Sequence, residues 1–127
     1  MITLTSITKR YGNTVALSDV SFTARQGEVL GLLGQNGAGK TTALNIITGC
    51  LAPSAGSVTI GGHDLIQEPR QARRLVGYLP EVPPLYDEMT VRAYLRFACE
   101  LKLVLPADIP AHVEEIAART GLKQMLG

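Results

Sequence analysis

The feature that most constrains this chain is one stretch, EVLGLLGQNGAGKTTALNIITG, at residues 28–49. Its first six residues, 28–33, are a short and mainly apolar run, which predicts a buried β-strand. The next eight, 34–41, match the pattern G-x-x-x-x-G-K-[ST] at every specified position. Apolar residues then recur at helical spacing from Thr42, and Gly49 suits the end of that helix. The stretch therefore predicts a strand, a glycine-rich loop (residues 34–41) and a helix in direct succession.

The glycine-rich loop has the composition of a polyphosphate-binding site. Glycine adopts positive φ without strain, so the backbone can curl until successive N–H groups point at the same phosphate oxygens. The start of the helix adds the positive end of its dipole at the same place. In this motif the Lys40 ammonium reaches the β- and γ-phosphates, and the Thr41 hydroxyl holds Mg²⁺. Thr42 is predicted to donate to the phosphate nearest the sugar.

The alternative interpretation is a glycine-rich turn that binds nothing. Glycine makes up roughly 7% of average composition, so a chance match to the whole motif is expected in well under about 1% of chains of this length. We therefore favour nucleotide binding. The predicted phosphate-binding residues are Gly34, Gln35, Asn36, Gly37, Ala38, Gly39, Lys40, Thr41 and Thr42.

Length and charge exclude several other classes of protein. The 127 residues amount to one domain or part of one. The net charge is +1 with the basic residues scattered, so no nucleic-acid-binding surface is expected. No apolar run approaches the roughly 20 residues that span a bilayer, and the N-terminus has no signal-like apolar core.

Cys50 and Cys99 lack metal-ligand spacing and are predicted to be two buried thiols in a reducing cytoplasm.

Strand signals lie on both sides of the loop. Residues 2–8 alternate imperfectly between apolar and polar side chains, and residues 15–22 form a second extended stretch. The turn at residues 11–13 predicts a hairpin between them. Residues 57–60 and 76–79 predict two further short strands.

Three helices are predicted after the first. Residues 69–75 form a short basic helix. Thr90 is a suitable N-cap for a helix that continues to about residue 101, with apolar residues at helical spacing. A last helix begins near Pro110, a favoured first-turn residue, and Gly121 is its expected C-cap.

Taken together, these residues resemble the ATP-binding cassette (ABC) ATPases over the whole chain. In that family an aromatic residue at the position of Tyr11 stacks on the adenine ring, and such stacking contributes about 1–3 kcal/mol per base. The alternative for Tyr11 is a tyrosine that fills a hairpin corner. The resemblance also implies that Val15 lies beside Tyr11, against the base or ribose.

Three other segments carry the same resemblance. They are ALSDVSF at residues 16–22, PSAGSV at 53–58 and VGYLPE at 76–81. The resemblance implies that His63 and Asp64 lie in a loop and do not form a site.

Glu81 stands where most of the family has a glutamine, in a segment called the Q-loop. There the glutamine contacts Mg²⁺ or the attacking water and couples the nucleotide site to the transmembrane partner. A carboxylate is a suitable hard ligand for Mg²⁺, but it only accepts hydrogen bonds, whereas an amide also donates. We therefore expect Glu81 to contact Mg²⁺. An ionised carboxylate does not donate hydrogen bonds, so any role that needs the N–H donor of the glutamine amide is not expected of Glu81. Residues 85–101 are similar to the subfamily that energises ABC-2-type exporters.

The resemblance implies an incomplete α/β fold of the P-loop NTPase (ABC ATPase) type. An antiparallel β region is expected over residues 1–27, the P-loop core with the first parallel strands over 28–80, and the Q-loop with the start of a helical subdomain over 81–127. The LSGGQ-type signature, the strand ending in Asp-Glu and the switch histidine do not occur in the sequence. We therefore expect the first half of an ATPase domain, either a truncated reading frame or a piece of a longer chain. Strands of the remaining half would flank residues 28–33, so an exposed apolar edge and self-association are predicted.

The function implied by the resemblance is ATP binding and hydrolysis coupled to transport, with export favoured, through a separate membrane permease. The cofactors are ATP and Mg²⁺, and the partners are the permease and a second ATPase subunit paired head to tail. The protein would be cytoplasmic and peripheral on the inner face of the cell membrane. Within this chain only Lys40 and Glu81 have a catalytic role, so the chain alone is not expected to turn ATP over.

Three alternatives remain open from the sequence. One is a soluble ABC ATPase that acts in translation or DNA repair, and another is a nucleotide-binding fragment that does not hydrolyse. The third is a different P-loop enzyme, a kinase or a GTPase. It is disfavoured because the guanine-reading N-K-x-D is absent and because it does not explain Tyr11 together with residues 78–81.

Overall fold

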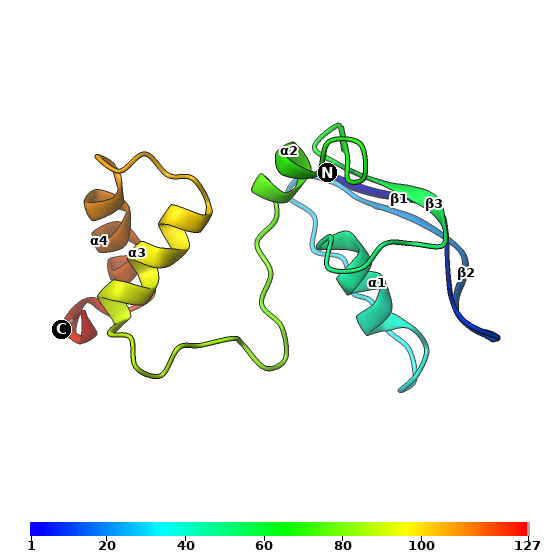
Figure 1. Ribbon diagram of the computed structural model, residues 1–127, viewed down its shortest axis with the longest axis horizontal. Coiled ribbons are helices and arrows are strands. Elements are labelled where there is room, and N and C mark those ends of the chain that lie inside the picture. Colours follow the sequence, from blue (N-terminus) through cyan, green and yellow to red (C-terminus); the bar gives the residue numbers. More distant parts are fainter. Residues whose placement is uncertain (127) are drawn as a thin grey trace. The chain divides into compact units, whose positions relative to one another are not determined.

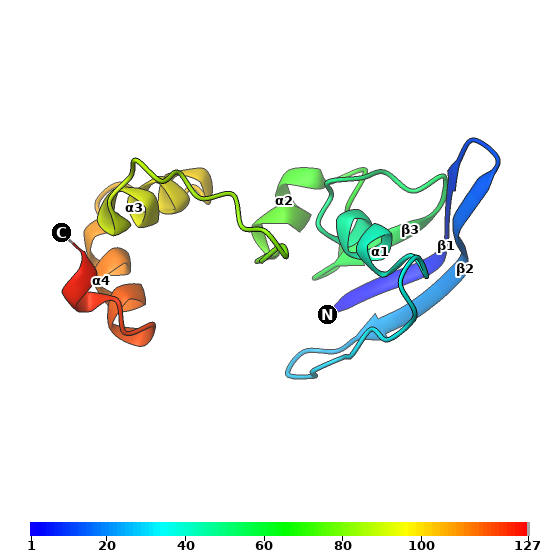
Figure 2. The same ribbon diagram turned by 90° about the horizontal axis from the view of Figure 1, so that it is seen from below.

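A computed structural model describes residues 1–126, and Gly127 lies outside the described part. The chain divides into two compact units, Met1–Tyr78 and Leu79–Gly127 (Figures 1 and 2). The elements are β1 (Ile2–Tyr11), β2 (Thr14–Ala24), α1 (Lys40–Ile47), β3 (Ala55–Ile60), β4 (His63–Asp64), α2 (Pro69–Arg74), α3 (Val91–Leu101), α4 (Ile109–Arg119) and the 3₁₀ helix η1 (Lys123–Met125). The three-part division at residues 27 and 80 stays a prediction.

The first unit is built on an antiparallel sheet in the order β2-β1-β3-β4. β1 and β2 form a hairpin whose register runs from Ile2 opposite Ala24 to Tyr11 opposite Thr14. The turn between them begins at Gly12, which has a φ of 56°. The hairpin predicted from the alternation and the turn is therefore confirmed, with longer strands than expected.

Helix α1 packs on one face of this sheet (Figure 2). Ala43, Ile46 and Ile47 are spaced i, i+3 and i+4, so they share the buried face of the helix. The helix predicted after the loop is confirmed; it begins at Lys40, and Gly49 follows its end with a φ of 73°. The buried members of the core are Leu4, Ile7, Leu17, Ala43, Ile46, Ile47, Val58, Ile60, Leu65 and Ala72.

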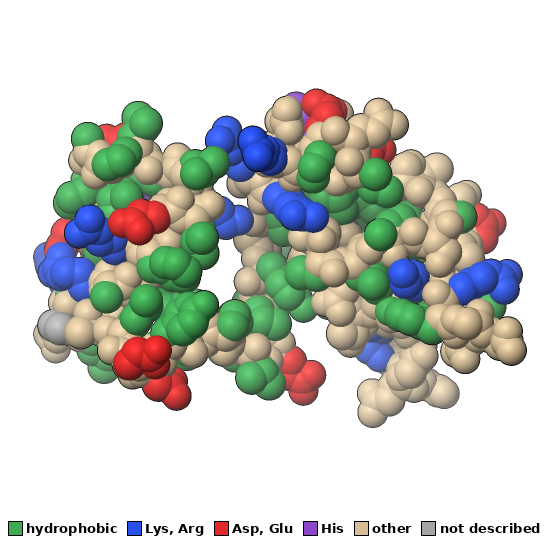
Figure 3. Space-filling model, in the orientation of Figure 1, with side chains coloured by type: hydrophobic (Ala, Val, Ile, Leu, Met, Phe, Trp, Pro, Cys, Tyr) green, Lys and Arg blue, Asp and Glu red, His purple; other side chains and the backbone are tan. Residues whose placement is uncertain are grey.

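Residues 28–33 do not form a strand in this structure, which corrects the prediction of a buried one. Val29 is 99% exposed and Leu33 is 93% exposed. A strand forms only where neighbouring backbone pairs with it, and no strand among residues 1–126 runs beside this segment. The strand predicted over residues 76–79 is also wrong, because these residues lie outside the described sheet. Hydrophobic side chains are consequently visible on the surface of the first unit (Figure 3).

The segment after β3 differs from the expected loop. His63 and Asp64 form the two-residue strand β4, which pairs with β3. Asp64 Oδ1 accepts hydrogen bonds from the backbone N–H groups of Ile66, at 2.8 Å, and Gln67, at 2.9 Å. His63 Nδ1 lies 3.1 Å from Glu68 Oε1. These side chains therefore shape the local turn that leads into α2.

The second unit packs α3 against α4. Thr90 Oγ1 accepts a hydrogen bond from the N–H of Ala93 at 3.2 Å, so the predicted N-cap of α3 is confirmed. The C-cap of α4 is Thr120, and Gly121, the predicted C-cap, follows it with a φ of 73°. Helix α3 ends at Leu101, as predicted, and the chain then turns at Leu103, whose φ is 59°. The buried core of this unit consists of Ile109, Val113, Ala117 and Leu126.

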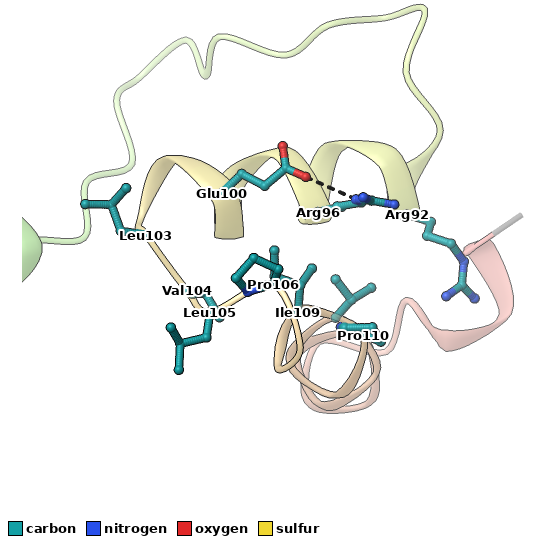
Figure 4. Close-up of a pocket in the computed structure, with 10 residues that line it drawn as sticks. Arg92, Arg96, Glu100, Leu103, Val104, Leu105, Pro106, Ile109 and Pro110 are labelled. Carbon is teal, nitrogen blue, oxygen red and sulfur yellow. Dashed lines mark hydrogen bonds and ion pairs between the residues drawn. The ribbon is translucent and has the colours of Figure 1, made fainter.

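A groove of about 690 Å³ lies beside α3 and α4 (Figure 4). Its wall includes Val104, Ile109 and Val113, and an ion pair of 3.1 Å joins Arg96 Nε to Glu100 Oε1 at its edge. None of the residues predicted to bind nucleotide lines this groove. Throughout the described chain, every helix is too short or too polar to cross a lipid bilayer.

Candidate functional site

The glycine-rich loop ends at an uncapped helix. Gly39, with a φ of 88°, occupies the N-cap position of α1 and has no side chain to offer. Its carbonyl accepts from the N–H of Ala43 at 2.8 Å, which is the first turn of the helix. The first turn contains no acidic residue. Because the first backbone N–H groups of a helix have no partner inside it, residues 40–42 present donors and a positive dipole end, which suit an anion.

Two glycines have conformations or surroundings that other residues could not share. Gly37 has a φ of 84°, next to a tight turn in which Ala38 N–H donates to the Gln35 carbonyl at 3.1 Å. A Cβ at Gly39 would collide with the carbonyl oxygen of Ala16 and lie 2.7 Å from Leu17 Cδ2. The loop is therefore pressed against β2, and only glycine permits that approach.

The Lys40 side chain folds back over the start of the loop. Its ammonium donates to the carbonyl oxygens of Gly34 at 2.5 Å and Gln35 at 2.7 Å. An ammonium has three donors, so one remains for a ligand. None of the ion pairs among residues 1–126 includes Lys40. Two carbonyl groups of the loop therefore bind the Lys40 ammonium, and none of the ion pairs in the described residues neutralises its charge.

These residues fit a bound polyphosphate with its Mg²⁺. Positive charge and backbone donors converge at the start of α1, where the Thr41 side chain is exposed and Thr42 is half-buried. No cluster of three His, Cys, Asp or Glu side chains in the described residues could hold a metal ion. The Thr41 hydroxyl is an oxygen ligand of the kind that Mg²⁺ takes together with phosphate oxygens.

Tyr11 lies on the face of the hairpin that meets the loop. It is the last residue of β1, its side chain is half-exposed, and Lys9 Nζ lies 5.3 Å from the centroid of its ring. Lys9 is opposite Leu17 in the register, and paired residues of a ladder project to the same face of a sheet. Leu17 in turn contacts the loop at Gly39. Tyr11 and the contact with the loop therefore lie on the same face of the hairpin, and stacking of adenine on Tyr11 stays a prediction.

Three predicted residues have different outcomes. Val15 lies opposite Arg10 and is exposed, so its place beside a base stays a prediction. Glu81 is exposed and belongs to the second unit, and its contact with Mg²⁺ also stays a prediction. Cys50 is exposed and accepts a hydrogen bond from Thr48 Oγ1 at 3.3 Å, so the expectation of a buried thiol there is wrong.

Lys9 is the residue at this site that sequence reasoning missed. Its ammonium lies over the Tyr11 ring and donates to the carbonyl of Ala52 at 2.7 Å. Residues i and i+2 of a strand share a face, but the strand was predicted over residues 2–8 only, so the sequence did not place Lys9 beside Tyr11; the observed strand continues to Tyr11. No feature of the sequence predicts the contact between Lys9 and the carbonyl of Ala52, which lie 43 residues apart in the chain.

Comparison with known proteins supports the same interpretation. Residues 17–126 match the family model for ABC transporters. The chain is 37% identical over 131 residues to the ABC transporter ATP-binding protein NatA of Bacillus subtilis, covering 99% of this chain and 53% of NatA. It is 42% identical over 89 residues to the Nod factor export ATP-binding protein I of Mesorhizobium japonicum, covering 70% of this chain and 26% of that protein.

A solved structure, an ATP binding subunit of an ABC transporter, matches with a TM-score of 0.86 and 31% identity over 99% of this chain and 52% of that one. The chain thus spans about half the length of NatA and of this structural neighbour. The likeness confirms the predicted fold class, a partial P-loop NTPase fold with an antiparallel N-terminal sheet. By sequence and by fold, the chain belongs to the ABC transporter family, as part of its ATP-binding domain.

Proposed function

We propose that this chain is the nucleotide-binding part of an ABC transporter ATP-binding subunit. In this proposal the adenine stacks on Tyr11, and the glycine-rich loop cradles the phosphates. The observation that carries the proposal is the Lys40 ammonium, held by two loop carbonyls at an uncapped helix start. The Lys40 ammonium has no carboxylate partner and lies beside the backbone N–H groups at the start of α1. Such a group of donors and positive charge is suited to bind a polyanion.

The roles of the other residues follow from their chemistry. The backbone N–H groups of residues 40–42 bind and orient the phosphates, and Thr42 donates to the one nearest the sugar. Lys40 stabilises the negative charge on the γ-phosphate. Thr41 would hold Mg²⁺, which would supply further charge neutralisation when bound.

Transport belongs to the complete assembly in this proposal. ATP binding and hydrolysis drive export through a separate permease, with a second ATPase subunit paired head to tail at the cytoplasmic face of the cell membrane. The name of the Nod factor export protein supports the direction, and residues 85–101 support the ABC-2-type exporter subfamily. Because the sequence has no carboxylate at an apolar strand end to polarise water, these 127 residues bind ATP without turning it over.

The direct test is titration of a fluorescent ATP analogue with Mg²⁺ into the full chain. Replacing Lys40 by alanine removes charge-assisted hydrogen bonds, so Lys40→Ala is expected to weaken binding by roughly 10- to 100-fold. Lys123→Ala in η1 removes the same charge from the other unit and serves as the control. Equal affinity of wild type and Lys40→Ala would contradict the proposal, and ATPase activity that Lys40→Ala abolishes would contradict the absence of turnover.

A further inference from the structure

The Lys9 side chain makes two defined contacts with other parts of the first unit. Its ammonium donates to the carbonyl oxygen of Ala52 at 2.7 Å and lies 5.3 Å from the centroid of the Tyr11 ring. Ala52 belongs to the loop between α1 and β3, which is anchored to β1 by the bond from Ser54 N–H to the Thr8 carbonyl at 2.8 Å. The charge of Lys9 is therefore fixed against one face of the Tyr11 ring by backbone from another part of the unit.

The position of Lys9 links it to the glycine-rich loop. Lys9 pairs with Leu17 in the β1–β2 register, and Leu17 touches the loop at Gly39. Lys9, Tyr11 and the loop therefore share one face of the hairpin, the face that α1 covers further along the sheet (Figure 2). A nucleotide whose phosphates occupy the loop would meet Tyr11 on this same face.

We infer that Lys9 is a positioning residue for the nucleotide base and that it acts through the Tyr11 ring. The inference rests on the proposed ATP site. Lys9 covers one face of the ring, so a base stacks on the other face only. It also holds a half-exposed side chain in place before the base arrives, which lowers the ordering cost of binding.

The electrostatics of the ring act in the same direction. The face of an aromatic ring carries partial negative charge, and two such faces repel when they stack. A cation on the far face of Tyr11 draws electron density toward itself and weakens that repulsion. Loss of the cation is therefore expected to weaken base stacking and to leave phosphate binding unchanged.

The experiment compares two ligands by isothermal titration calorimetry on the full chain: Mg·ATP, and Mg·tripolyphosphate, which has no base. Lys9→Gln keeps an N–H donor for Ala52 and removes the charge. It is expected to weaken ATP binding about two- to fivefold, since exposed cation–π contacts have that magnitude, and to leave tripolyphosphate binding unchanged. Lys9→Arg retains the charge and is expected to restore ATP affinity. Arg10→Gln, at the next residue of β1, is the matched control for the lost charge.

The outcomes separate the inference from the function on which it rests. If Lys9→Gln binds ATP as wild type does, or loses both ligands equally, or still weakens ATP binding in a Tyr11→Ala background, Lys9 does not act through the ring and the inference is overturned. Unchanged tripolyphosphate binding shows that the loop of the variant is folded. If wild type binds ATP and Lys40→Ala does not, the function stands and the Lys9 variants alone decide the inference. If wild type binds neither ligand, the function and the inference fail together.

Discussion

Single residues of the glycine-rich loop are constrained in two different ways. Gly37 and Gly39 both have positive φ, at 84° and 88°. Nothing lies within 4 Å of a Cβ built on Gly37, whereas one built on Gly39 meets the backbone of Ala16 and the side chain of Leu17. The sequence motif specifies Gly39 and leaves the residue at position 37 open. The structure adds that the specified glycine is the one packed against β2.

The pair of glycines gives a residue-scale prediction. Gly37→Ala is expected to destabilise the chain by about 1–2 kcal/mol, the cost of a left-handed conformation for a residue with a Cβ. Gly39→Ala bears the same cost plus a steric collision, so it is expected to lose about 1–3 kcal/mol more. Urea unfolding followed by circular dichroism measures both variants. Equal destabilisation would show that the contact with Ala16 does not constrain the loop.

The ends of a secondary-structure element can be predicted from sequence where residues close to the terminus determine them. Thr90 begins α3 with its own hydroxyl, and Gly121 ends α4 with a positive φ. Both devices involve residues within one turn of the terminus, so sequence alone exposes them. A strand has no such local encoding, because its hydrogen bonds are made to another segment. Residues 28–33 and 76–79 have strand-like composition, but neither segment belongs to the sheet that the structure describes among residues 1–126.

The cap of α3 gives an element-scale prediction. Thr90→Ala removes the acceptor for the Ala93 N–H and is expected to destabilise α3 by about 1 kcal/mol. Hydrogen exchange of the α3 amides should then become roughly fivefold faster. Thr90→Ser keeps the hydroxyl and is the control. Exchange that is equal in Thr90→Ala and wild type would mean that packing on α4, and not the cap, determines where this helix begins.

At the scale of the whole molecule, the chain exposes apolar surface that a folded domain normally buries. The exposed side chains include Val29 at 99%, Leu33 at 93% and Leu79 at 82%. The first two belong to the unpaired segment before the glycine-rich loop. Exposed apolar segments of strand-like composition favour pairing with other chains.

This surface predicts self-association of the 127-residue chain. Val29→Lys places a charge on the exposed segment and is expected to lower the fraction of oligomer in sedimentation velocity runs across a concentration series. Ile66→Lys introduces the same charge at another exposed apolar site, 61% exposed, in the same unit and is the control. Wild-type chain that sediments as a monomer at every concentration would contradict the prediction, and so would an equal effect of the two variants.

The sequence by itself determined the glycine-rich loop, the helix that follows it, the hairpin before it and the family, because each depends on residue types at short, regular spacing. Tertiary structure alone decided that Lys9 lies over Tyr11, that Gly39 is pressed against β2 and that residues 28–33 form no strand in the described sheet. Those facts depend on segments distant in sequence, such as Ala52 beside Lys9. A backbone carbonyl is available at every residue, so residue type does not reveal which one a side chain meets.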